Sequence, residues 1–299
     1  MTGYRYRSLT TAVDDKSSPL RRYLDQRYPN TKPVQAPYRS GAGPLLVGQS
    51  RANAGTLGTA FDLIVKLTLD HTHVPPVSPG FLDLPHLWVI SEVLRVAQTS
   101  ADEALSGDLD EETARACWAL ALCSEAYRLG VVYPDSSLDH AINDDRFSPE
   151  GLIAIATDDA VRDLQLLHSV AVDNLYPHLP TAPNSLTLGP TFDGSKLCSA
   201  DADLVIDGLL VELKTRLGTE TKRSGMRHDS MSLIDLYQVI AYVLFDHSDS
   251  FAIGEVAFYS GRYGHFFQTP IDDLLRTLAG EPIDLSVERS TVWSLLGGA

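Results

Sequence analysis

The stretch from Asp201 to Thr215 constrains the fold of this chain more than any other part of its sequence. Two apolar runs, Leu204–Ile206 and Leu209–Leu213, flank the pair Asp207-Gly208. An Asp-Gly pair between such runs is the strongest short-range signal for a two-residue β-hairpin. The turn fixes the strand register, so the sequence predicts four opposed pairs: Ile206 with Leu209, Val205 with Leu210, Leu204 with Val211, and Asp203 with Glu212.

The two faces of this hairpin differ in polarity. Side chains alternate between the faces of a strand, so one face is wholly apolar: Leu204, Ile206, Leu209, Val211 and Leu213. The other face is apolar near the turn, and its far end carries four charged residues: Asp201, Asp203, Glu212 and Lys214. Opposed like charges destabilise a strand pair, so Asp203 and Glu212 need a counter-charge.

Two interpretations of that charged end are open. Lys214 alone makes it a salt-bridged polar face, whereas a divalent cation is a stronger counter-charge because hard cations prefer carboxylate oxygens. Asp201 falls opposite Lys214, and we expect it to be the partner of that lysine rather than a further metal ligand.

The helix expected after the hairpin carries a second signal. Leu233–Phe245 is apolar nearly all round, begins with the capping pair Ser232 and Asp235, and contains Gln238 and Tyr242 four residues apart. With these residues, the chain resembles the PD-(D/E)xK (restriction-endonuclease-like) nuclease superfamily, in its RecB-like branch, over about residues 186–270. Members carry an Asp on one hairpin strand and Glu-x-Lys on the next, and RecB-like members add the Gln and Tyr. Ala202 stands where the family motif has Pro.

This resemblance implies a metal-dependent nuclease that hydrolyses the phosphodiester bonds of DNA, as a defence or repair effector. It implies that Asp203, Glu212 and the main-chain carbonyl of Leu213 bind Mg²⁺ or Mn²⁺. Lys214 is expected to orient the attacking water or to stabilise developing charge.

The resemblance also assigns residues on helices. Gln238 and Tyr242 are expected to face Lys214 or a DNA phosphate; a satisfied core amide with a packed ring is the alternative. RecB-like members often place another acid or a His on the helix before the hairpin. Three residues are candidates for that position, with the first preferred: Glu125, Asp163 and His168.

The fold class that follows is α/β, with the αβββαβ mixed sheet of a PD-(D/E)xK core flanked by helices. Residues 149–299 are expected to form this core: a helix over 149–175 broken near 156–158, strands at 185–192, 252–259 and 263–269, and the hairpin and helix above. Residues 55–148 are predicted to form an N-terminal helical region. Residues 1–54, rich in Pro, Gly, Ser and Arg, are predicted to be a basic extended arm with one short helix at 19–28.

Charge and cysteine content bear on the partners and the compartment. The net charge of −15 is unusual for a DNA-binding protein, since phosphate contacts need a basic surface. Residues 1–39 carry +5, however, and a basic loop spans 214–228, so both segments are candidate DNA contacts. No stretch has the roughly 20 apolar residues that span a bilayer, and three cysteines without a CxxC pair favour the cytoplasm.

Two other functions remain open from the sequence. The first is a catalytically silent nuclease-fold protein that binds nucleic acid or a partner protein, which the acidic charge favours. The second is an α/β interaction protein whose hairpin face is only an ion-pair cluster. The complete set of Asp203, Glu212 and Lys214 favours the nuclease over both.

Overall fold

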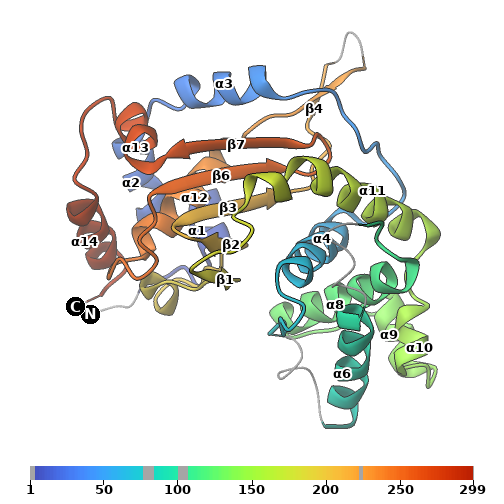
Figure 1. Ribbon diagram of the computed structural model, residues 1–299. Helices are drawn as coiled ribbons and strands as arrows, with labels where there is room; N and C mark the ends of the chain where they lie inside the picture. The colour runs from blue at the N-terminus through green and yellow to red at the C-terminus, as the bar shows by residue number, and fades with distance from the viewer. Residues whose placement is uncertain (1–3, 77–83, 100–106, 222–224, 299) are drawn as a thin grey trace.

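A five-stranded mixed sheet is the centre of the fold (Figure 1), in a computed structural model that describes residues 4–76, 84–99, 107–221 and 225–298. The strands lie in the order β1 (Leu186–Leu188), β2 (Leu204–Ile206), β3 (Leu209–Lys214), β6 (Glu255–Ser260) and β7 (His265–Pro270). β3 and β6 are parallel, and the other neighbours are antiparallel. The protein is therefore a mixed α/β structure, as the sequence predicted at this level.

The central hairpin has the predicted register. Its pairs are Leu204 with Val211, Val205 with Leu210, and Ile206 with Leu209. Asp207 and Gly208 both have positive φ, at 47° and 79°, which is the backbone of a type I′ turn. A Cβ on Gly208 would lie 2.7 Å from the main-chain oxygen of Ala252, so this turn needs glycine for space as well as for φ.

Helices cover both faces of the sheet. The predicted apolar face of the hairpin belongs to one core, which it shares with Ala257 and Tyr259 of β6 and with helices α4, α8 and α11 described below. Val205 and Leu210 point the other way, into a second core formed mainly by α12 (Leu233–Phe245). With both faces covered, the exposed charged groups of β3 are confined to its carboxyl end, at Glu212 and Lys214.

Residues 4–54 form helices rather than an extended arm. These are α1 (Leu9–Asp14), α2 (Pro19–Arg27) and α3 (Lys32–Gly41). Leu9, Leu20, Leu24 and Tyr38 are buried in the second core, and α3 lies along β7 (Figure 1). The burial of these apolar side chains outweighs the local preference of Pro and Gly for irregular backbone.

The next part of the chain is helical, as predicted, and occupies the lower right of Figure 1. It comprises α4 (Ala54–Leu69), α6 (Leu84–Thr99), α8 (Glu111–Leu129) and α9 (Ser137–Asn143), followed by α10 (Pro149–Ile153) and α11 (Asp158–Asn174). The predicted break between the last two is confirmed, because Thr157 caps the start of α11 through the amide of Ala160.

The remaining elements are short or C-terminal. They are the 3₁₀ turns η1 (Tyr176–His178) and η2 (Asp193–Lys196), the ribbon of β4 (Thr219–Glu220) and β5 (Arg227–His228), and the helices α13 (Ile271–Ala279) and α14 (Leu285–Leu295). Within the described residues, none of the helices combines the length and the apolar character that crossing a membrane requires.

Candidate functional site

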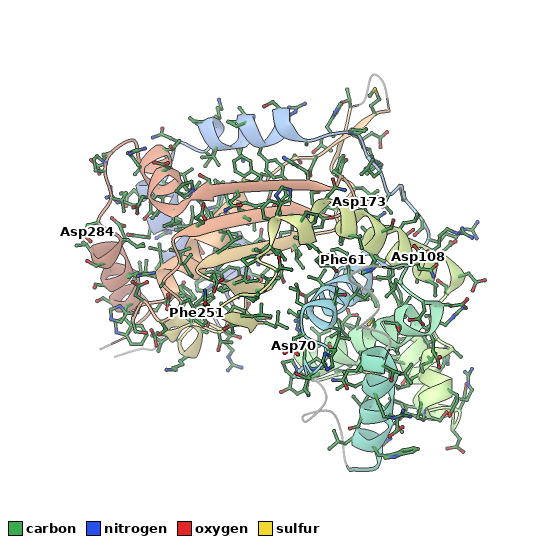
Figure 2. The ribbon with its side chains drawn as sticks, in the orientation of Figure 1. Phe61, Asp70, Asp108, Asp173, Phe251 and Asp284 are labelled. Carbon is green, nitrogen blue, oxygen red and sulfur yellow. The ribbon has the colours of Figure 1, made fainter. Side chains whose placement is uncertain are left out.

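A cavity of about 290 Å³ opens where the carboxyl end of β3 meets α4. Figure 2 labels Phe61 on α4, one of the residues that line this cavity. Its polar lining comes from both sides of the junction: Thr59, Asp62 and Arg128 from helices, and Asp203, Glu212, Lys214, Thr215 and Arg216 from the hairpin and the residues after it. Three predicted site residues, Asp203, Glu212 and Lys214, therefore share one cavity, and Leu213 lies in its wall.

Asp203 is fixed by the backbone of the opposite strand. Its Oδ2 accepts a hydrogen bond of 2.6 Å from the amide of Leu213. Its own main-chain oxygen accepts from the amide of Gly189, next to the edge strand β1. These contacts orient the carboxylate along the charged end of the hairpin and leave Oδ1 for another partner.

Lys214 joins the hairpin to α12. Its Nζ lies 2.5 Å from Oε1 of Glu212 and donates to Oε1 of Gln238 at 3.4 Å. Gln238 in turn donates to the hydroxyl of Tyr242 at 2.5 Å. The structure thus brings the five side chains predicted from the sequence into one connected group, and the amide of Gln238 faces Lys214.

The capping residue of α12 adds a second anion near the lysine. Asp235 accepts from the amide and hydroxyl of Ser232, lies 3.9 Å from Lys214 and forms an ion pair with Arg216. The same carboxylate therefore begins the helix and restrains both cations at the rim of the cavity.

The carboxylates are costly to keep charged in this setting. Burial raises the pKa of Glu212 to about 7, against the opposing attraction of Lys214. Burial, with repulsion from Asp62, likewise raises the pKa of Asp203. Oε2 of Glu212 and Oδ1 of Asp62 are buried and, among the described residues, have no hydrogen-bond partner. Buried polar atoms are nearly always paired, so these oxygens have unused capacity for a cation.

Asp62 is a site residue that the sequence analysis missed. Its side chain is 18% exposed, and its Oδ2 lies 2.7 Å from Nζ of Lys66 one helical turn later. Burial raises the pKa of Asp62, and the nearby Lys66 opposes that rise. Asp62–Lys66 is a charged pair inside the otherwise apolar run 59–69, which was the available signal.

Other sequence candidates lie outside the lining of this cavity. Glu125 is exposed on α8. Asp163 is buried in an ion pair with Arg262 at 3.1 Å and accepts from Ser50, which gives it a structural role. His168 is fully buried, with its ring 6.0 Å from that of Tyr176.

The expected pairing of Asp201 with Lys214 is wrong. Asp201 Oδ2 lies 3.6 Å from Arg128, while Thr191 is its bridge partner in the sheet. Strand β2 begins only at Leu204, so the backbone has left the ideal hairpin path at residue 201.

The predicted basic segments are partly used inside the protein. Arg21 and Arg27 of the N-terminal segment pair with Asp25 and with Glu281 and Glu288, respectively. In the loop 214–228, Arg227 pairs with Glu220, whereas Lys222 and Arg223 lie outside the described residues. The cations that reach the cavity are Arg216 and Arg128, with side chains 53% and 59% exposed.

A search of the described residues for three or more His, Cys, Asp or Glu side chains grouped as a metal site finds none. Asp203, Glu212 and the carbonyl of Leu213 offer only two such side chains. Their hard oxygen donors, and the unpaired Oε2 of Glu212, nevertheless suit Mg²⁺ or Mn²⁺, which bind through one or two carboxylates and retain water. Comparison of the chain with protein-family models, curated proteins and solved structures gives no significant match.

Proposed function

We propose that this protein is a metal-dependent nuclease that hydrolyses the phosphodiester bonds of DNA. The observation that carries the proposal is the shared cavity of Asp203, Glu212 and Lys214, with Gln238 in contact with the lysine. The element order α11, β1, β2, β3, α12, β6 agrees with the αβββαβ core that the resemblance implies. These are independent supports, since one concerns side chains and the other the path of the chain.

Each residue has a defined task in this proposal. Asp203, Glu212 and the Leu213 carbonyl would hold Mg²⁺ or Mn²⁺, and Asp62 is placed to contribute a third carboxylate. The bound ion lowers the pKa of its water and offsets charge on the phosphoryl oxygens. Lys214, held by Glu212 and Gln238, orients the attacking water or stabilises the charge that develops on the phosphate. Arg216 and Arg128 supply positive charge at the mouth for the neighbouring phosphates.

Incubation of supercoiled plasmid with Mg²⁺ or Mn²⁺ tests the activity. Wild-type protein should nick or linearise the plasmid, and EDTA should stop it. Lys214→Ala should lower the rate at least a hundredfold, because no other described cation contacts both Glu212 and Gln238. Lys32→Ala, at an exposed lysine of α3, is the matched control and should cut normally.

Two results would contradict the proposal. Cutting that is equally fast in Lys214→Ala removes the assigned role of the lysine. Wild-type protein that binds the plasmid in a gel shift but does not cut it with either metal is instead the catalytically silent nuclease-fold protein.

A further inference from the structure

A second cavity, of about 360 Å³, lies between the β1–β2 loop and the α12–β6 loop. Phe192 and Phe251 form its aromatic side, with ring centroids 5.3 Å apart in an edge-to-face contact. Phe192 is buried, whereas Phe251, labelled in Figure 2, is partly exposed. The cavity therefore presents an accessible aromatic ring supported from behind by another ring.

Two sets of contacts connect this cavity with the candidate site. The ring of Phe192 stacks on Tyr242 with centroids 5.7 Å apart and planes 28° apart, and Tyr242 leads through Gln238 to Lys214. On the surface, Asp201 lines the second cavity and pairs with Arg128, which lines the first. One route is internal and the other exposed, so the two cavities belong to the same region of the molecule.

The charges at the second cavity are unsuited to a phosphate. Asp193, Asp201 and Asp246 line it, with Lys196 as the lysine among them. Asp246 is occupied by the amides of Ser250 and Phe251, but the side chain of Asp201 is 57% exposed. A free carboxylate next to an aromatic ring accepts hydrogen bonds from the amino group of a base while the ring stacks on it.

We propose that this second cavity binds an amino-bearing nucleobase (cytosine, adenine or guanine) of the strand whose phosphodiester occupies the Asp203–Glu212 site. The inference rests on the proposed nuclease function and adds the substrate class to it: a single-stranded segment read by base as well as by phosphate. Phe251 stacks on the base, and Asp201 accepts from its amino group. Arg128, between the two cavities, contacts an intervening phosphate.

Binding in a non-cleaving background tests this inference. Glu212→Gln protein would be titrated with fluorescent (dC)₈ and (dT)₈, because thymine lacks the amino group. (dC)₈ should bind more tightly than (dT)₈. Phe251→Leu, which keeps most of the packing on Phe192, should weaken (dC)₈ binding roughly tenfold, and Asp201→Asn should remove the preference for (dC)₈. Phe147→Leu, at another partly exposed phenylalanine far along the chain, should bind both oligonucleotides unchanged.

Three outcomes would overturn the inference. Equal affinity for the two oligonucleotides refutes recognition of the amino group, and unchanged binding by Phe251→Leu refutes the stack. If free dCMP binds as tightly as (dC)₈, the cavity is a mononucleotide site and not part of a strand path. Plasmid cutting by the wild type is scored separately, so a protein that cuts but shows no base preference loses only the subsite. A protein that prefers (dC)₈ but never cuts loses only the nuclease.

Discussion

The buried carboxylate of Glu212 predicts an unusual result, namely that neutralising a central site residue stabilises the metal-free protein. Glu212 is 3% exposed, and its Oε2 lacks a hydrogen-bond partner among the described residues. We therefore expect Glu212→Gln, which has nearly the same shape without the charge, to be more stable than the wild type in EDTA at pH 8.

The magnitude follows from the pKa of Glu212. It rises from an ordinary value of 4.5 to about 7, mainly because of burial. At about 1.4 kcal/mol for each pKa unit, charging this group above pH 7 costs the folded state roughly 3 kcal/mol. The attraction of Lys214 is already contained in that figure. Because the folded pKa is the higher one, the cost is absent below pH 4.5, grows between pH 4.5 and 7, and is complete above pH 7.

Urea unfolding in EDTA at pH 8 and at pH 4.5 measures this effect. The free energy of unfolding of Glu212→Gln should exceed that of the wild type by roughly 2–3 kcal/mol at pH 8, and the difference should be close to zero at pH 4.5. Glu125→Gln, at an exposed glutamate of α8, should match the wild type at both pH values. Saturating Mg²⁺ should stabilise the wild type more than Glu212→Gln. A Glu212→Gln protein that is less stable than wild type at pH 8 would refute the argument.

Three further changes have defined outcomes. Asp62→Asn should weaken Mg²⁺ binding about tenfold in calorimetry, because it removes one of three carboxylates at the cavity, and an unchanged affinity would exclude Asp62 as a ligand. Arg216→Gln should weaken DNA binding and lower the slope of log K against log salt by about 1; an unchanged slope would show that Arg216 does not contact a phosphate. Gly208→Ala should cost about 2–3 kcal/mol of stability, since its Cβ would lie 2.7 Å from the Ala252 oxygen at a φ of 79°, whereas Gly254→Ala, with no atom within 4 Å, should be mild.

The hairpin and its following helix could be predicted because their signals are local. Asp207-Gly208 fixes the turn and, through it, the pairing of Leu204 with Val211. Ser232 and Asp235 fix the start of α12 as predicted, at Leu233. Once the helix packs on the hairpin, Gln238 faces Lys214 because both lie near the same end of the sheet.

The N-terminal segment could not be predicted in the same way. Its helices are short, so their stability comes from the surface on which they pack rather than from their own sequence. Leu9 and Ala12 contact α12, and Tyr38 lies against Phe258 and Phe267 from β6 and β7. These partners are more than 200 residues away in the chain, and nothing in residues 1–54 identifies them.

The position of Asp62 shows the same limit at the site itself, and it changes the charge balance. Together with Asp203 and Glu212 it brings three carboxylates to the cavity, faced by the two buried or partly buried ammonium groups of Lys66 and Lys214. With all five groups charged the site carries one net negative charge, which is unfavourable for an approaching phosphodiester. A divalent ion reverses that to one positive charge, equal and opposite to the single charge of the scissile phosphate. On this count, an acidic protein needs no basic groove at the reacting centre, and DNA should bind the cavity more tightly with the metal than without it.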